Sequence, residues 1–358
     1  MHYSPSLART FYGFLILCLL MGPLSADAQE SQGAFLDVGL LVFDPGIPAD
    51  KAARSRLGIF PEIRKSEAKY MPVILRDVLM QQAGWGAVRV LPELMDSPEL
   101  LVTGEILHSD GQQLSLQIRA QDAAGVIWLD AVYEGSATPA DYTESLQSDP
   151  FVQVYENIAA DLQQVRERLG AARTSTIREI ALLRYAAALA PEVFGDYLVV
   201  GESGEYVLQR LPARGDPMLE RIIRLREQEY RFIDTVDEQY VNLSDAIAPA
   251  YLLWREYSAE QAVFVGDFED RVLGRKSRAR PGSFAALEQT YNTYRLSRIH
   301  AQDLDELALG FNNEVLPTSL EISGTVYKLS GTLENQYGEW RDILQQIFAL
   351  ETGLTPSP

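Results

Sequence analysis

The stretch from residue 100 to residue 134 constrains the fold of this chain most, because its pattern predicts three consecutive strands. Leu100–His108 leads into Ser109-Asp110-Gly111, which is a strong turn signal. From Leu114 to Gln121 apolar residues alternate with polar ones, which predicts a strand with one solvent-facing side. A second turn leads into Val126–Glu134. The stretch therefore predicts an antiparallel meander.

Segments on either side of this meander extend the pattern to β-α-β-β-β-α. The apolar run from Phe35 to Phe43 is long enough for one buried strand. Apolar residues recur at steps of three and four over residues 71–79, which predicts a helix, and residues 87–91 predict a short strand. An apolar stripe over residues 151–169 predicts a second helix. We therefore expect an α+β fold that begins with a mixed β-sheet and helices packed on it.

Short capping and breaking signals predict where the helices begin and end. Pro72 is expected in the first turn of the first helix or at a kink, and Gly84 is expected to cap its end. Thr176-Ile-Arg-Glu179 is a capping box and predicts a helix start. Asp216-Pro217 predicts another start, with an N-cap followed by a proline at the first helical position. Ser258, three residues before Gln261, predicts a further one.

Beyond the α/β unit the chain is predicted to be mainly helical until it ends in a β-hairpin and a helix. One helix is expected over residues 283–311, the hairpin over 319–333 and the last helix over 334–350. A hairpin with a single helix cannot bury both of its faces, so it is expected to dock on the helical region. The expected division is a signal peptide at 1–28, an α/β envelope module at 29–170, a helical domain at 171–313 and the hairpin plus helix at 314–358.

The first 28 residues have the pattern of a secretory signal. Arg9 precedes an apolar run from Phe11 to Met21, and Ala26-Asp27-Ala28 is the small-x-small pattern at which a signal peptidase cuts. We expect cleavage after Ala28 and a periplasmic or secreted protein of a Gram-negative bacterium. No later segment has 18 consecutive apolar residues, so no transmembrane segment is expected in the mature chain.

The single cysteine of the chain, Cys18, lies inside this signal. A lipoprotein signal needs a small residue just before the cysteine, and Leu17 occupies that place, so lipidation at Cys18 is not favoured. The mature chain would then be cysteine-free, without a disulfide, a thiolate metal site or a cysteine nucleophile.

The formal net charge of −19 disfavours nucleic acid as a partner, because most of the surface would repel it.

Two glycine-containing segments carry a resemblance. Gly84-Trp85-Gly86-Ala87-Val88 leads into the second predicted strand, and Leu101-Val102-Thr103-Gly104 lies in the third. With these segments and the predicted strand order, residues 34–169 resemble the periplasmic α/β module of envelope proteins of the TolB amino-terminal, CsgG and LpoB type. The C-terminal hairpin and helix, with the strand pattern V-x-x-L-S-G-T at residues 326–332, weakly resemble the BON envelope domain. The first resemblance implies a protein that binds other envelope proteins or joins a secretion complex, and no catalysis by this module.

Residue types that carry chemistry are few or dispersed. The histidines His108 and His300 lie apart in the sequence, and no metal site or other cofactor is expected. Carboxylates near aromatic residues in the helical half could instead converge in a cleft, as a hydrolase of cell-wall or envelope polymers requires. They are Asp234, Asp237, Glu238 and Glu256.

One cationic run interrupts the acidic composition. Five cations and no acid fall within ten residues, next to Pro281-Gly282: Arg271, Arg275, Lys276, Arg278 and Arg280. This run is the candidate contact patch, and it could meet lipopolysaccharide phosphates, anionic phospholipid headgroups or an acidic protein. The alternative is a solvated linker between two helices.

The sequence therefore favours a non-catalytic periplasmic envelope protein that acts as a protein-binding or assembly factor. The first alternative is the carboxylate-dependent hydrolase, and the second is an oligomeric component of a secretion complex.

Overall fold

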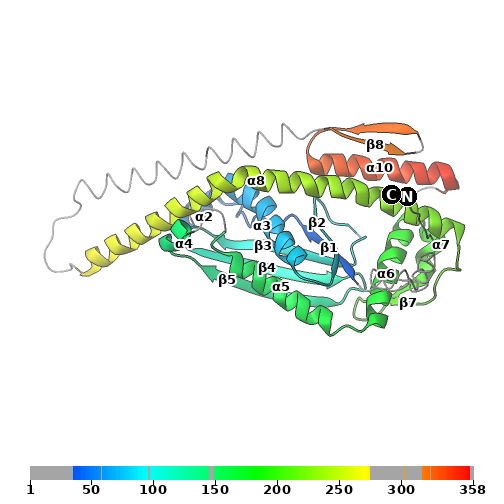
Figure 1. Cartoon of the computed structure of the whole chain (residues 1–358), viewed down its shortest axis with the longest axis horizontal. Helices are drawn as coiled ribbons and strands as arrows, with labels where there is room; N and C mark the ends of the chain where they lie inside the picture. The colour runs from blue at the N-terminus through cyan, green and yellow to red at the C-terminus, as the bar shows by residue number, and fades with distance from the viewer. Residues whose placement is uncertain are drawn as a thin grey trace, which may run out of the picture.

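The computed structural model describes residues 35–57, 59–95, 97–144, 149–274, 302, 317–322 and 324–354. It confirms the α+β class: a mixed five-stranded sheet with helices, a long helical region, and a hairpin followed by a C-terminal helix (Figure 1). The elements of the first part are β1 (Leu36–Leu41), α2 (Lys51–Arg56), α3 (Pro61–Gln81), β2 (Trp85–Leu91), β3 (Leu100–Ser109), β4 (Gln113–Asp122), β5 (Ile127–Ser136), α4 (Pro139–Glu144) and α5 (Val152–Glu167). Those of the second part are α6 (Ala171–Leu189), α7 (Pro191–Phe194), β6 (Leu198–Val200), β7 (Tyr206–Leu208), α8 (Pro217–Gly274), β8 (Thr318–Ile322), β9 (Thr325–Leu329) and α10 (Leu333–Thr352).

The large sheet has the strand order β2-β1-β3-β4-β5. Strand β1 is parallel to both β2 and β3, whereas β3, β4 and β5 form the antiparallel meander that the sequence predicts. Leu116 of β4 lies opposite Ile106 of β3 and Tyr133 of β5, which places the apolar residues of the meander on one face. Helices α3 and α5 pack against each other and against this sheet. The core of the α/β unit lies between them and the apolar face.

Pro72 lies in the middle of α3, so the expected position in its first turn is wrong. A proline has no N–H to donate to the carbonyl four residues earlier, which leaves the oxygen of Ala68 without its partner in the helix. The backbone N–H of Phe43, just after β1, donates to that oxygen at 2.9 Å. The proline therefore frees an acceptor that ties α3 to the chain leaving the sheet.

Gly84 is not the cap of α3, because the helix ends at Gln81 and Gln82 is its C-cap residue. Gly84 instead lies in the turn into β2 with φ at 105°, a conformation that favours glycine. The guanidinium of Arg166 on α5 occupies the space that a Cβ would take, and its Nη1 donates to the Gly84 carbonyl at 2.9 Å. Glycine is therefore required for the turn and for the contact with α5.

Helix α8 spans 58 residues without interruption. It begins as predicted at Pro217, and Asp216 Oδ1 accepts hydrogen bonds from the N–H groups of Met218 and Leu219. Two other expected helix starts are wrong: Thr176 lies inside α6, which begins at Ala171, and Ser258 lies inside α8. At a rise of 1.5 Å per residue, α8 is about 87 Å long. Figure 1 shows it running along the β2 side of the sheet and continuing past α2 and α4.

The hairpin β8–β9 and helix α10 lie along the first half of α8 (Figure 1). The ring of Phe232 on α8 stacks on Tyr337 and Trp340 of α10 at centroid distances of 6.1 and 6.0 Å. All three side chains are buried. The C-terminal segment therefore shares one apolar core with α8. The helix expected over residues 283–311 lies outside the described residues, apart from position 302.

Candidate functional site

The structure describes only the first residue of the predicted contact patch. Arg271 lies in the last turn of α8, and Arg275, Lys276, Arg278 and Arg280 lie outside the described residues, as does His300. Arg271 follows the fully buried Arg255 by 16 residues, which places it about 24 Å further along the helix axis. The start of the patch is therefore carried away from the sheet by the helix itself.

The candidate hydrolase carboxylates attach α8 to the sheet. Asp237 Oδ1 accepts the N–H of Val90 at 2.8 Å, and its Oδ2 lies 2.9 Å from Arg76 of α3. Asp234 Oδ1 accepts from Nε of Arg89 at 2.5 Å. Val90 belongs to the edge strand β2, so Asp237 satisfies a backbone donor that the sheet leaves unpaired. Burial raises the pKa of Asp237, while the Val90 and Arg76 contacts lower it.

The other two candidates do not join them in a cleft. Glu238 is exposed, and Glu256 is partly exposed more than four helical turns further along α8. The four carboxylates are thus spread along the helix, and the two that are bound most closely hold it on the sheet. His108 at the end of β3 contacts Asp110 through Nε2 at 2.9 Å, next to the β3–β4 turn.

A buried charge cluster fixes the middle of α8. Arg255 is fully buried, with Nη1 3.1 Å from Asp149 Oδ1 and Nη2 3.7 Å from Glu67 Oε1. Glu67 Oε1 also accepts the hydroxyl protons of Ser109 at 2.5 Å and Tyr251 at 2.6 Å. The guanidinium lies 4.6 Å from the ring centroid of Tyr251, which adds a cation–π contact. Sequence patterns missed this cluster because its members are contributed by α3, β3, the segment before α5, and α8.

A second buried carboxylate, Glu99, organises the chain between β2 and β3. Its Oε2 accepts the N–H of Asp37 at 2.8 Å, and its Oε1 lies 3.3 Å from Nε of Arg178 on α6. Burial raises the pKa of Glu99. Two residues earlier, the carbonyl of Ser97 accepts from Nη2 of Arg226 at 2.7 Å and from the Tyr230 hydroxyl at 2.9 Å. Helix α8 thereby positions the loop at Ser97, and helix α6 positions it at Glu99.

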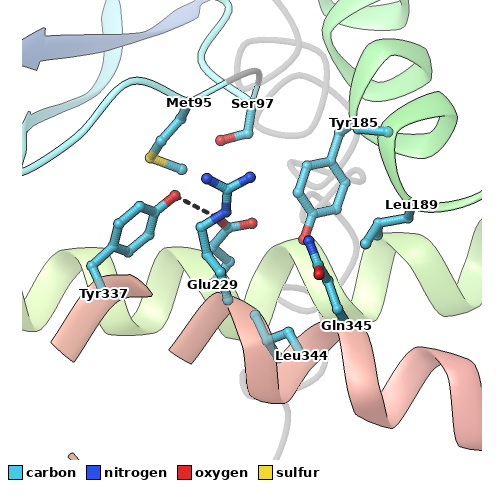
Figure 2. Close-up of a pocket in the computed structure, with 10 residues that line it drawn as sticks. Met95, Ser97, Tyr185, Leu189, Glu229, Tyr337, Leu344 and Gln345 are labelled. Atoms are coloured by element: carbon cyan, nitrogen blue, oxygen red, sulfur yellow. Dashed lines mark hydrogen bonds and ion pairs between the residues drawn. The ribbon is translucent and has the colours of Figure 1, made fainter. Parts of the chain in front are cut away.

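A pocket of about 40 Å³ lies where this loop meets α6, α8 and α10 (Figure 2). Met95 and Ser97 come from the loop, and Figure 2 shows Glu229 between Tyr337 and Tyr185. The remaining lining side chains belong to α6 and α10: Ala188, Leu189, Tyr337, Arg341, Leu344 and Gln345. Four segments far apart in the sequence therefore build one small site.

The polar groups of this pocket centre on Glu229, which is buried. The Tyr337 hydroxyl donates to Glu229 Oε1 at 2.7 Å, and Nε of Arg341 lies 3.9 Å from the same oxygen. Burial first, and then the Glu229 charge, raise the pKa values of Tyr185 and Tyr337 well above the usual range of tyrosine. Both hydroxyls are therefore protonated at neutral pH and act as donors. The hydroxyl of Ser97 is buried and has no hydrogen-bond partner among the described residues.

Within the described part of the chain, no three His, Cys, Asp or Glu residues are grouped so that they could hold a metal ion. None of the helices searched there combines the length and apolar content that crossing a membrane requires. No protein-family model, curated protein or solved structure matches this chain.

Proposed function

We propose that this chain is a non-catalytic envelope protein that binds a protein partner through the distal part of α8 and the cationic run 271–280 that begins in its last turn. The observation that carries the proposal is the length of α8. Its first part is held on the sheet by Asp234 and Asp237, its middle by Arg255, and it then continues for about a further 24 Å to Arg271. The last turn of α8, where the cationic run begins at Arg271, therefore lies away from the sheet.

Charge supports the same proposal. The chain carries a net charge of −19, and the run 271–280 contains five cations without an acid. A cationic segment on an acidic protein is attracted to an acidic partner surface, while the rest of the molecule is repelled by it, which favours one binding orientation. We therefore propose that the partner presents an acidic surface to this segment.

Two further features support an envelope location. Residues 1–28 have the pattern of a cleaved secretory signal, and the β-α-β-β-β-α order agrees with the proposed likeness of residues 34–169 to the TolB, CsgG and LpoB type of module. Proteins with that module bind other envelope proteins. Fractionation of the tagged full-length chain tests the location, and retention of the uncleaved chain in the cytoplasm would contradict it.

The partner is tested by crosslinking and pull-down of the mature protein from envelope extracts. A five-site variant neutralises the patch by replacing Arg271, Arg275, Lys276, Arg278 and Arg280 with glutamine. A matched variant makes the same change at five exposed cations elsewhere: Lys51, Arg168, Arg214, Arg224 and Arg231. Both variants have the same net charge, so a difference between them depends on position.

We expect the wild type and the matched variant to enrich the same partner, and the patch variant to lose it. Enrichment should also fall as salt is raised, because attraction between exposed charges is screened. Equal enrichment by all three proteins would refute the role of the patch. Failure of the wild type to enrich any protein would refute the proposed binding function.

A further inference from the structure

The pocket beside Glu229 contains polar groups that the fold itself does not use. We propose that this pocket binds a small monocarboxylate, with the Arg341 guanidinium and the Ser97 hydroxyl holding the carboxylate group. This site lies near the beginning of α8, at the opposite end from the cationic run, so the inference stands independently of the proposed function (Figures 1 and 2).

Ser97 is the first observation. The residue is only 1% exposed, and its hydroxyl has no partner among the described residues. Buried polar groups in folded proteins nearly always have a partner, so an orphaned hydroxyl at a pocket wall indicates a missing one. Figure 2 shows the Ser97 side chain directed into the space enclosed by the lining residues. Its backbone is fixed by Arg226 and Tyr230, so the hydroxyl is held ready for a ligand.

Arg341 is the second observation. Its contact with Glu229 is made through Nε, and no hydrogen bond joins its two terminal nitrogens to the described residues. The side chain is 41% exposed, so a ligand can reach it from solvent. A guanidinium presents parallel N–H groups that match the two oxygens of a carboxylate. Arg341 and Ser97 together therefore offer three donors to one anion.

The charge of the pocket selects a singly charged anion. Arg341 is only partly neutralised by Glu229, because Nε lies 3.9 Å from the carboxylate and Tyr337 donates the shorter hydrogen bond. Arg226 adds a second cation near Ser97, where its Nη2 donates to the Ser97 carbonyl at 2.7 Å. A doubly charged phosphate would meet the buried charge of Glu229 at close range, and that repulsion is strong where little water screens it.

The size and walls of the pocket select a short ligand. The pocket volume of about 40 Å³ is slightly larger than the volume that one molecule occupies in liquid water. It is far below the volume of common ligand pockets. Met95, Leu189 and Leu344 supply apolar surface beside the polar groups. The enclosed space therefore suits the carboxylate group itself, and the carbons attached to it would lie on the open side, where Arg341 is 41% exposed. The ligand is either a free short-chain acid or the carboxylate at a chain end.

The test uses the mature protein with acetate and propionate as probes and inorganic phosphate as the comparison anion. Binding is measured by ligand-observed NMR and by the rise in melting temperature at constant ionic strength. A pair of Ala-Ala dipeptides, one with a free and one with an amidated C-terminus, distinguishes a chain end from a free acid. The variants are Arg341→Gln, Arg341→Lys and Ser97→Ala, with Arg224→Gln as a control at an exposed site on the same helix as Glu229.

We expect propionate to bind in the millimolar range and phosphate to bind at least tenfold more weakly. R341Q should lose at least tenfold in affinity, R341K should lose less because it keeps the charge, and S97A should lose several-fold. S97A should leave the melting temperature without ligand nearly unchanged, because it removes a hydroxyl that has no partner. Binding of the free dipeptide alone would assign the site to chain ends. Equal binding by wild type and R341Q, equal affinity for phosphate, or no binding of any carboxylate would overturn the proposal.

Discussion

Replacing Arg255 by methionine should destabilise the protein more than any other change of one cation on α8. Methionine keeps an apolar side chain between Phe151 and Tyr251, whose ring centroids both lie 4.6 Å from the guanidinium. It removes the cation that faces Glu67 and Asp149, whose side chains are 0% and 2% exposed. The substitution therefore isolates the loss of charge from the loss of packing.

The expected loss of unfolding free energy is about 3–5 kcal/mol, the range found when one partner of a buried ion pair is removed. Arg64 still lies 3.3 Å from Glu67 Oε2, so Glu67 keeps one cation. Asp149 loses its ion pair with Arg255, and the backbone N–H of Phe151 remains its donor at 2.8 Å. We therefore expect the penalty to arise mainly from Asp149.

Urea denaturation followed by tryptophan fluorescence measures the effect, with Arg224→Met at an exposed position on α8 as the matched control. The control should stay within about 0.5 kcal/mol of wild type. A triple variant with Glu67→Gln, Asp149→Asn and Arg255→Met should be more stable than R255M alone, because it leaves no buried charge without a partner.

A loss below about 1 kcal/mol in R255M would refute the reasoning, because it would place the cluster among ordinary exposed pairs. The same conclusion would follow if the triple variant were less stable than R255M. Either result would mean that the buried charge cluster contributes little to holding the middle of α8 in place.

Two further predictions concern the turn between β3 and β4. Gly111→Ala should lower the free energy of unfolding by about 1–3 kcal/mol, because a Cβ at this position would overlap the Arg255 carbonyl and the Ala259 nitrogen of α8. The control is Gly338→Ala, which places a Cβ in open space beside α10. It should be neutral or raise the free energy of unfolding by up to about 1 kcal/mol in the same denaturation measurement. Asp110→Asn should lower stability at neutral pH. Burial opposes the charge of Asp110, but hydrogen bonds from His108, Gln112 and Gln113 outweigh it and hold the pKa of this carboxyl below its usual value of 3.8. A carboxyl whose pKa is lowered by folding stabilises the fold at pH values above its unfolded-state pKa, and this effect is lost as the pH falls through its folded-state pKa. The stabilities of wild type and D110N should therefore converge in urea titrations as the pH falls below 3.8. A constant gap would contradict the assignment.

Local patterns predicted the first sheet well because each strand carries its own signal. The alternation in β4 and the turn at Ser109-Asp110-Gly111 are encoded within a few residues. The signals that failed were those whose result depends on packing. The Thr176 and Ser258 motifs are compatible with a helix start, yet both positions lie within longer helices whose buried faces continue through them.

The site could not be predicted, because no short segment contains it. Ser97, Tyr185, Glu229 and Arg341 span nearly 250 residues, and each is an ordinary polar residue in its local context. Asp234 and Asp237 show the opposite case. Sequence proximity to aromatic residues made them candidate catalytic acids, and the structure gives them ion pairs with cations of β2 and α3.

The cover that α8 places over β2 has a consequence for how the chain is made. Val90 and Asp237 are 147 positions apart, so the edge of the sheet emerges from the ribosome long before the helix that shields it. At translation speeds of about 5–20 residues per second, the interval is on the order of 7–30 seconds. An uncovered edge strand can pair with another chain during that time. Synthesis of this protein therefore includes a period in which a nascent chain is open to aggregation and to capture by chaperones.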